Sequence, residues 1–265
     1  MSRIISVANH KCGVGKTTTA VNLAACLAAM GQEVLLIDLD PQGNASSALA
    51  FPRDEQSRGT ADVLLGLRSL DEVVQPSWYQ HLYIAPCTRA LVGVEVELVD
   101  LPQREQRLAA ALCRFARPLD WVIIDCPPNL GLLTVNALAA SHSVLIPLQA
   151  QHYAIEGLGQ LLDSIAAVKR DLNPRLVREG VLITLADLRT NLGRDVEGQA
   201  REVFGRDVFD TVIPLNLRLA EAPSYQRPII HFDPGCRGAV AYQAVAGELL
   251  LRHQRKVAPA TFRVA

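Results

Sequence analysis

One short segment near the start of the chain constrains the fold more than any other feature. Residues 11–18 read Lys-Cys-Gly-Val-Gly-Lys-Thr-Thr, between an apolar strand-like run at 4–8 and a helix-like run at 19–30. Glycines at such a junction let consecutive backbone N–H groups face one anion, and the N-terminus of the following helix adds a partial positive charge. The segment therefore predicts a phosphate-binding loop, in which Lys16 reaches the terminal phosphates and the Thr17 hydroxyl holds Mg²⁺.

The loop departs from the strict Gly-x4-Gly-Lys-Ser/Thr pattern. His10 stands five residues before Gly15, and a further lysine, Lys11, lies inside the loop. This form resembles the loop of the deviant Walker A ATPases, which reads Lys-Gly-Gly-Val-Gly-Lys-Thr-Thr. In that group the early lysine reaches across a nucleotide sandwich dimer to the partner's phosphates. The resemblance holds at every position except Cys12.

The length of the chain and the alternation of its apolar runs predict the fold. The chain has 265 residues, 49% of them apolar, which is enough for one sizeable domain. Strand-like runs alternate with helix-length stretches, and they lie at 4–8, 33–38, 82–85, 121–124, 143–146, 180–184 and 210–212. This pattern predicts an α/β fold, a single domain with a mostly parallel twisted sheet and helices on both faces.

The remaining segments are assigned by composition. We expect a solvated loop at 52–59, a short helix at 61–65 and a last helix at 240–253. The domain is expected to span residues 1–255, followed by a flexible C-terminal tail at 256–265.

Charge and cysteine content narrow the class of protein. The formal net charge is −1, so binding to nucleic acid or anionic lipid would need a local patch. The six cysteines show no Cys-x-x-Cys pair or zinc-type spacing with histidine, which is typical of reduced cytosolic thiols. No signal peptide or apolar run long enough to span a bilayer is evident, so we expect a soluble intracellular protein.

Three aspartates follow predicted strands. Asp38 and Asp40 lie at the carboxyl edge of the sheet, where ligands of this architecture bind. Asp40 is the better catalytic candidate, because a carboxylate there can position the water that attacks a γ-phosphate; an Asp-Pro turn is the competing structural interpretation. Asp125 ends the run at 121–124 and is suited to ordering the hydration shell of Mg²⁺. The predicted metal site therefore comprises Thr17, Asp40 and Asp125.

Four further motifs, in order along the chain, resemble those of the ParA/Soj partition ATPases, at 38–44, 125–128, 153–157 and 216–224. The similarity spans roughly residues 3–250. It implies a P-loop NTPase of the deviant Walker A type that hydrolyses ATP with Mg²⁺. ATP would close a homodimer, the dimer would bind double-stranded DNA non-specifically, and a ParB-like protein would trigger hydrolysis and release. The protein would be cytoplasmic and nucleoid-associated, without stable membrane association.

The resemblance also implies roles for individual residues. Lys11, Lys16 and Asp40 would be catalytic, with Lys11 reaching across the dimer. The segment at 213–216 would lie against the adenine. The nucleotide-binding residues would be Lys11, Cys12, Gly13, Val14, Gly15, Lys16, Thr17, Thr18, Pro214 and Asn216.

A DNA surface is harder to place, because the helix-turn-helix extension of larger plasmid members is absent from the sequence. Binding is expected to rest on arginines that neutralise phosphates without reading bases, with Arg189, Arg218, Arg227 and Arg237 as candidates. The competing interpretation for each is a solvated arginine or an intramolecular ion pair, and Glu221 offers Arg218 an i,i+3 partner.

Cys12 stands where the family carries glycine, beside Lys11. We hypothesise that the nucleotide still binds but the sandwich dimer is weakened, because the side chain strains the loop, separates the subunits or blocks Lys11. The alternative is that cysteine is small enough to be accommodated.

Other functions share parts of this pattern. A ParA-like positioning switch or scaffold for a protein cargo would keep nucleotide binding. A MinD-like membrane-cycling ATPase would need a basic amphipathic C-terminal helix, and the sequence after 253 lacks a strong stripe of that kind. A metabolic phosphotransferase would need an acceptor pocket, for which no motif is evident.

Overall fold

A seven-stranded sheet organises the molecule, for which the computed structural model describes residues 2–52, 58–151 and 156–257. The strand order is β3-β4-β2-β5-β1-β6-β7, and all neighbours are parallel except the antiparallel pair β3 and β4. The strands are β1 (Arg3–Val7), β2 (Val34–Asp38), β3 (Gln75–Pro76), β4 (Leu82–Ala85), β5 (Trp121–Asp125), β6 (Ser143–Gln149) and β7 (Val177–Thr184).

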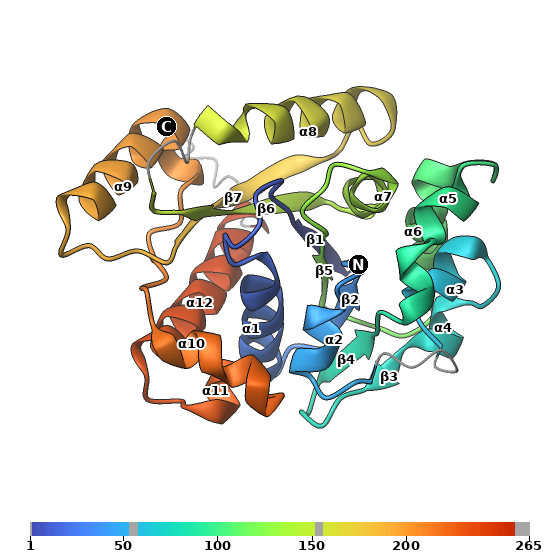
Figure 1. The fold of residues 1–265 in the computed structure, drawn as a ribbon, viewed down its shortest axis with the longest axis horizontal. Coiled ribbons are helices and arrows are strands. Elements are labelled where there is room, and N and C mark those ends of the chain that lie inside the picture. Colours follow the sequence, from blue (N-terminus) through green and yellow to red (C-terminus); the bar gives the residue numbers. More distant parts are fainter. Residues whose placement is uncertain (1, 53–57, 152–155, 258–265) are drawn as a thin grey trace, which may run out of the picture.

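Helices cover both faces of the sheet (Figure 1). They are α1 (Lys16–Ala29), α2 (Asn44–Ala48), α3 (Thr60–Leu65), α4 (Leu70–Val73), α5 (Val94–Leu98), α6 (Arg107–Arg114), α7 (Leu132–Ala140), α8 (Gly159–Asp171), α9 (Asn191–Phe204), α10 (Leu217–Glu221), α11 (Ile229–Phe232) and α12 (Arg237–Val257). Short 3-10 helices are η1 (Arg89–Val92), η2 (Arg104–Gln106), η3 (Glu156–Leu158), η4 (Gly205–Asp207) and η5 (Ala222–Tyr225).

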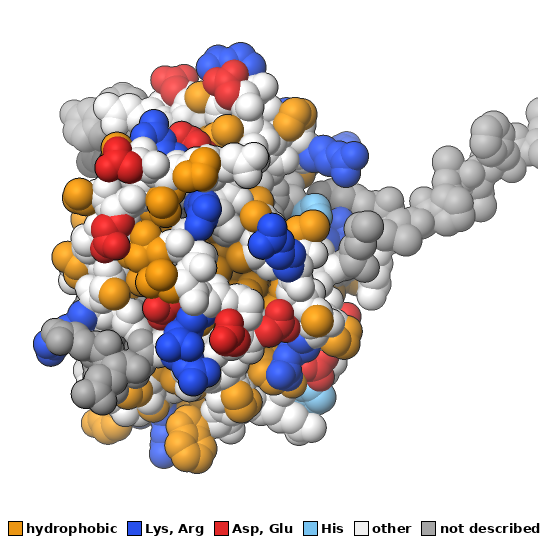
Figure 2. Space-filling model, turned by 90° about the vertical axis from the view of Figure 1, so that its right-hand side faces the viewer, with side chains coloured by type: hydrophobic (Ala, Val, Ile, Leu, Met, Phe, Trp, Pro, Cys, Tyr) orange, Lys and Arg blue, Asp and Glu red, His pale blue; other side chains and the backbone are white. Residues whose placement is uncertain are grey.

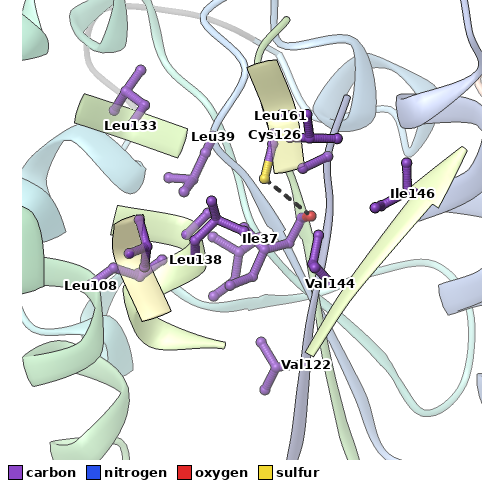
Figure 3. Packing of buried hydrophobic residues seen from close by; sticks show 14 of the residues in the cluster. Ile37, Leu39, Leu108, Val122, Cys126, Leu133, Leu138, Val144, Ile146 and Leu161 are labelled. Carbon is purple, nitrogen blue, oxygen red and sulfur yellow. Dashed lines mark hydrogen bonds between the residues drawn. The ribbon is translucent and has the colours of Figure 1, made fainter. Parts of the chain in front are cut away.

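Two hydrophobic cores result from the alternation of side chains along each strand. Ile37 and Val122 point into a core that also holds Leu133 of α7 and Leu161 of α8 (Figure 3). On the opposite face, residues of β2 and β5 such as Leu36 pack against α1, which in turn packs against α12. Because both faces are covered, the strands are apolar almost throughout, as expected for a parallel sheet.

The predicted fold class is confirmed, and so are the strands expected at 4–8, 33–38, 82–85, 121–124 and 143–146, with ends that shift by at most three residues. The strand predicted at 180–184 begins earlier, at Val177, because the polar Arg178 and Glu179 hide its start. The two-residue strand β3 was not expected, since so short an edge strand containing proline leaves no pattern.

The strand predicted at 210–212 is wrong. The chain there runs beside β7, with isolated bridges of Val208 with Val181 and of Pro214 with Ala186, and the N–H groups of Phe209 and Ile213 donate to the carbonyls of Val181 and Ile183, each over 2.9 Å. Between them the N–H groups of Asp210 and Thr211 donate to the carboxylate of Glu248 on α12, at 2.9 and 3.0 Å. A side chain of α12 therefore holds the middle of this segment, where a regular strand would continue the ladder with β7.

The helix predictions are confirmed with shifted ends. Helix α1 begins at Lys16, inside the predicted loop, and α3 matches the expected helix at 61–65. Helix α12 extends to Val257, so residues 256 and 257 of the expected tail are helical. The rest of that tail, most of the loop at 52–59 and most of the motif at 153–157 lie outside the described residues. Within the described ranges, none of the helices is long and apolar enough to cross a membrane.

Candidate nucleotide and magnesium site

The predicted phosphate loop connects β1 to α1 at the carboxyl edge of the sheet. Gly13 and Gly15 adopt φ angles of 75° and 85°, a left-handed backbone that only glycine enters without cost. A Cβ at Gly13 would meet no atom within 4 Å, so the glycine is needed for its backbone angle and not for space. Helix α1 starts directly after Gly15 and has no acidic residue in its first turn, which leaves its N-terminus open to an anion.

Two residues that the sequence analysis did not single out hold this loop in place. The Thr184 hydroxyl, at the end of β7, donates to the carbonyl of Val14 over 2.8 Å. The Asn9 amide donates to the carbonyl of Pro147 over 2.7 Å, and its oxygen accepts the N–H of Lys11 at 3.0 Å. Both are polar residues at the carboxyl ends of strands, which is the signal that could have found them.

The two lysines of the loop have different surroundings. Lys16 is 7% exposed, and its Nζ donates to the carbonyl of Lys11 over 2.8 Å. Burial lowers the pKa of Lys16, while the nearby Asp125 opposes that shift. The side chain of Lys11 lies against Gly157, where any Cβ would overlap it. Gly157 therefore makes room for the lysine expected to reach a second subunit.

Three aspartates gather beside the loop, because Asp38 and Asp125 are register partners on the adjacent strands β2 and β5. Asp125 is fully buried, and neither of its oxygens has a hydrogen bond of good geometry within the described part of the chain. Burial, followed by the charge of Asp38, raises the pKa of Asp125 well above its usual range, while the Thr17 hydroxyl and Lys16 act in the opposite direction.

A buried, unpartnered carboxylate is costly unless a cation satisfies it. Asp125 lies next to Thr17 and Lys16, where the sequence places a magnesium ion, and hard oxygen donors are the ligands that Mg²⁺ prefers. The residues present therefore fit a hydrated Mg²⁺ ion with a phosphate group beside it.

Asp40 and Asp38 differ in burial and in their hydrogen bonds. Asp40 is 6% exposed and faces the cleft, and its Oδ1 accepts the N–H of Gln42 at 2.9 Å, so the turn interpretation also holds. Asp38 is fully buried and accepts the N–H and hydroxyl of Ser46 at 2.8 and 2.6 Å and the N–H of Asp40 at 3.2 Å. Burial raises the pKa of Asp38 to about 6. The sequence analysis gave Asp38 no role, whereas the structure makes it the anchor of the turn that carries Asp40.

The cleft above these residues has a volume of about 410 Å³. Cys12, Gly13, Gly15, Lys16, Thr17, Thr18, Asp40 and Asn216 line it, all of them predicted site residues. Leu185, with a φ of 51°, forms part of its wall. Pro214 does not line this cleft; it faces an adjacent cavity, although its neighbours Ile213 and Leu215 are in the wall. Val14 is buried behind the loop.

Cys12 is exposed and does not adopt a positive φ angle. Strain through a left-handed backbone at Cys12 is therefore excluded, because Gly13 and Gly15 are the described loop residues that occupy that region. The idea that it hinders a second subunit stays a prediction.

The four arginines considered for DNA binding lie at the surface. Arg189 pairs with Asp187 over 2.8 Å, and this pair lowers the pKa of Asp187 to about 2. Arg237 lines the same cavity of about 530 Å³ as Arg189. Arg218 makes the expected i,i+3 pair with Glu221 over 2.8 Å and a second pair with Asp233 over 2.7 Å. Arg227 lies near Tyr79 and His231.

Known proteins are similar to this chain in sequence and in fold. A family described as "AAA domain" matches residues 2–178. The sporulation initiation inhibitor protein Soj of Bacillus subtilis is 48% identical over 94% of this chain and 98% of its own length. The chromosome partitioning protein ParA of Myxococcus xanthus is 47% identical over 97% of this chain and 90% of its own length. A structure named cobyrinic acid a,c-diamide synthase from Mycobacterium smegmatis, with bound ADP and magnesium, is 36% identical, covers 96% of both chains and has a TM-score of 0.83. The phosphate loop, its neighbouring aspartates and these relatives together show that the chain belongs to the Soj/ParA family of chromosome-partitioning ATPases.

Proposed function

We propose that this protein is a partition ATPase that converts ATP and water to ADP and phosphate with Mg²⁺, and uses the cycle to segregate a chromosome or plasmid. The observation that carries the proposal is the buried, unpartnered Asp125 beside Lys16 and the N-terminus of α1. Such a site supports phosphoryl transfer, which depends mainly on placement and electrostatics. The identity with partition proteins over nearly the whole chain supports the cargo.

Each residue has a defined task in this proposal. Lys16 and the loop N–H groups neutralise the phosphate oxygens, and Thr17 with Asp125 would hold the metal ion, which supplies charge neutralisation when bound. Asp40 orients the attacking water, and its backbone N–H donates to the carboxylate of Asp38. Hydrolysis is slow until a partner protein completes or rearranges the site.

The cycle has three further steps. ATP closes a homodimer in which Lys11 leaves Gly157 and reaches the partner's nucleotide. The dimer binds double-stranded DNA non-specifically, so that the protein is cytoplasmic and associated with the nucleoid. A ParB-like protein then stimulates hydrolysis and release. Because Arg189 and Arg218 are held by acidic neighbours, DNA phosphates must compete with Asp187, Glu221 and Asp233 for them.

Sedimentation velocity with Mg-ATP and with Mg-ADP, each with and without duplex DNA at low salt, tests this proposal. We expect a dimer only with ATP, and a shift onto DNA that disappears at higher salt. Asp40→Ala should keep the dimer and the DNA complex while phosphate release is lost. A monomer that binds ATP and never moves onto DNA would contradict the partition cycle and favour the switch or scaffold interpretation.

Matched arginine variants test the DNA surface. Arg189→Ala and Arg218→Ala should each weaken DNA binding and lower its salt dependence. Arg170→Ala is the control, because Arg170 is also an exposed arginine paired with a neighbour, Asp171, over 2.7 Å. Equal losses in all three variants would argue against a defined surface. Phosphate release without any added acceptor separates an ATPase from a phosphotransferase.

A further inference from the structure

Helix α5, with the preceding η1, presents apolar side chains on two opposite sides. Leu91, Val94 and Leu98 face inward and are fully buried in the core. Val92, Val96 and Val99 face outward and are 68%, 78% and 53% exposed. Their spacing of four and three residues places them along one line of a helix. We call these three outward residues the valine face. A helix that is apolar on both sides is normally covered on both.

The charges beside the valine face limit what can cover it. Glu97 and Asp100 are exposed at the end of α5, and neither makes an ion pair within the described part of the chain. Two arginines belong to the same stretch of chain, and both are already engaged: Arg104 donates to the carbonyl of Val99 over 2.7 Å and pairs with Glu105 over 2.9 Å, and Arg89 of η1 also has a partner. Figure 2 views the side of the molecule on which α5 lies, and it shows hydrophobic side chains at the surface among charged ones.

These charges favour a basic partner over a second copy of this chain. Two copies packed through the valine face would bring Glu97 and Asp100 of each close to their counterparts, and like charges in contact are unfavourable. A segment with apolar residues on one side and lysine or arginine at its edge would satisfy both features of the surface.

The inner side of α5 is bonded to the loop that follows Asp125. Oε1 of Glu95 accepts the N–H of Leu133 in the first turn of α7 at 3.2 Å, and Oε2 lies 3.5 Å from the amide of Asn129. A carboxylate in this position stabilises a helix N-terminus. A displacement of α5 would therefore shift the segment that begins with Asp125.

A second connection leads from the start of η1 to Asp40. The N–H of Cys87, two residues before Arg89, donates to Oγ of Ser46 over 2.8 Å, and that hydroxyl donates to Asp38 over 2.6 Å. Asp38 in turn accepts the N–H of Asp40. Glu95 of α5 thus contacts the loop that follows Asp125, and Cys87, just before η1, is linked through Ser46 to the turn that carries Asp40.

We propose that the valine face, with Glu97 and Asp100, is the docking surface for a basic amphipathic segment of the activating partner, and that docking acts on Asp40 and Asp125 through Ser46 and Glu95. This inference rests on the proposed function, whose ParB-like partner it locates on the molecule. Ser46 and Glu95 are positioning residues, because they act through other groups and do not face the cleft.

The test measures phosphate release against the concentration of a purified ParB-like protein from the same genome, in the presence of duplex DNA. Val96→Arg should raise the half-saturating concentration about tenfold, as expected for a central apolar contact, and Glu97→Lys about threefold, as expected for a rim charge. Both should leave the basal rate unchanged.

Val203→Arg on α9 is the control, because Val203 is 60% exposed elsewhere on the surface. Glu95→Gln should bind the partner normally and lower only the maximal stimulation.

The other outcomes would overturn either the docking surface or the proposed function. Unchanged half-saturation in both Val96→Arg and Glu97→Lys overturns the docking surface, as does a wild-type protein that turns over ATP and binds DNA but does not respond to the partner. A change of dimer affinity in Val96→Arg without partner would mean that a second copy covers the valine face, which also overturns the proposal. Absence of basal ATP turnover and of DNA binding in the wild type would instead refute the proposed function, before any partner is added.

Discussion

Two buried carboxylates differ in their hydrogen-bond partners: one lies near the amino ends of the parallel strands and the other at their carboxyl ends. Glu179, near the start of β7, is 4% exposed and accepts the Ser143 hydroxyl at 2.6 Å, with Nε2 of His253 at 3.1 Å. Asp125, at the end of β5, is fully buried and has no hydrogen bond of good geometry among the described residues. A partnered acid holds elements together, whereas an unpartnered one stores an unfavourable energy that a ligand can relieve. We call the side of the sheet with Glu179 the structural edge and the side with Asp125 the nucleotide edge.

The largest effect on stability is expected at the structural edge. Glu179→Ala leaves Ser143 and His253 without their partner and should lower the free energy of unfolding by about 3–5 kcal/mol. Urea unfolding followed by circular dichroism measures this. Arg206→Ala, an exposed change at the same edge, should stay within about 0.5 kcal/mol of wild type. If the Glu179 variant were as stable as that control, the buried contacts would not be structural.

At the nucleotide edge, the largest effect is on turnover. Lys16→Ala removes the buried cation next to Asp125 and should slow phosphate release by about 10² to 10³, as for the loss of one donor to a transition-state oxygen. The variant should still fold, because the buried charge that it removes is itself costly, as the lowered pKa of Lys16 shows. The control is Lys169→Ala on α8, where the side chain is exposed. Equal rates for the two variants would place the phosphates elsewhere.

The unpartnered acid should also make stability depend on pH. Burial raises the pKa of Asp125, and that of Asp38 to about 6, so the folded state binds more protons than the unfolded one at pH values above the ordinary aspartate pKa of about 3.9. Stability of the metal-free protein is therefore lost as the pH rises through this window. Asp125→Asn replaces the buried ionisable group by a neutral one, so less stability should be lost as the pH rises. The Tm at pH 7 should therefore increase by about 2–4 °C.

Thermal unfolding in EDTA at pH 5 and pH 7, without nucleotide, measures this difference. The variant should gain less at pH 5, because a larger share of the wild-type carboxyl is protonated there than at pH 7. Asp163→Asn, an exposed change on α8, should follow the wild type at both pH values. An Asp125→Asn protein that is less stable at pH 7 would show that the carboxylate is satisfied in the folded state.

The two edges also differ in how far the sequence predicts them. The glycines, Lys16 and Asp125 at the nucleotide edge were predictable, because each follows directly from a local pattern of loop, helix start and apolar strand. Ser46, which links Asp38 to Cys87, depends on tertiary neighbours and leaves no local pattern. Thr184 is marked as a polar residue at the end of a strand, but the carbonyl that its hydroxyl holds lies 170 positions away and cannot be identified from the sequence. The same reason explains the wrong strand at 210–212, since Glu248 on α12 takes the hydrogen bonds of that segment.

The smallest effect is expected at Cys12, the exposed residue of the nucleotide edge that departs from the family. Because Cys12 does not occupy the left-handed region, Cys12→Gly relieves no strain and should lower stability by about 0.5–1 kcal/mol through the entropy of the unfolded chain. Its side chain nevertheless stands beside Lys11 on the surface expected to meet a second subunit. Cys12→Gly should therefore lower the dissociation constant of the ATP-bound dimer severalfold, which sedimentation equilibrium measures, whereas Cys12→Ser, of similar size, should match the wild type. If the glycine variant dimerises like the wild type, the cysteine is accommodated, and the nucleotide edge works as in relatives that carry glycine.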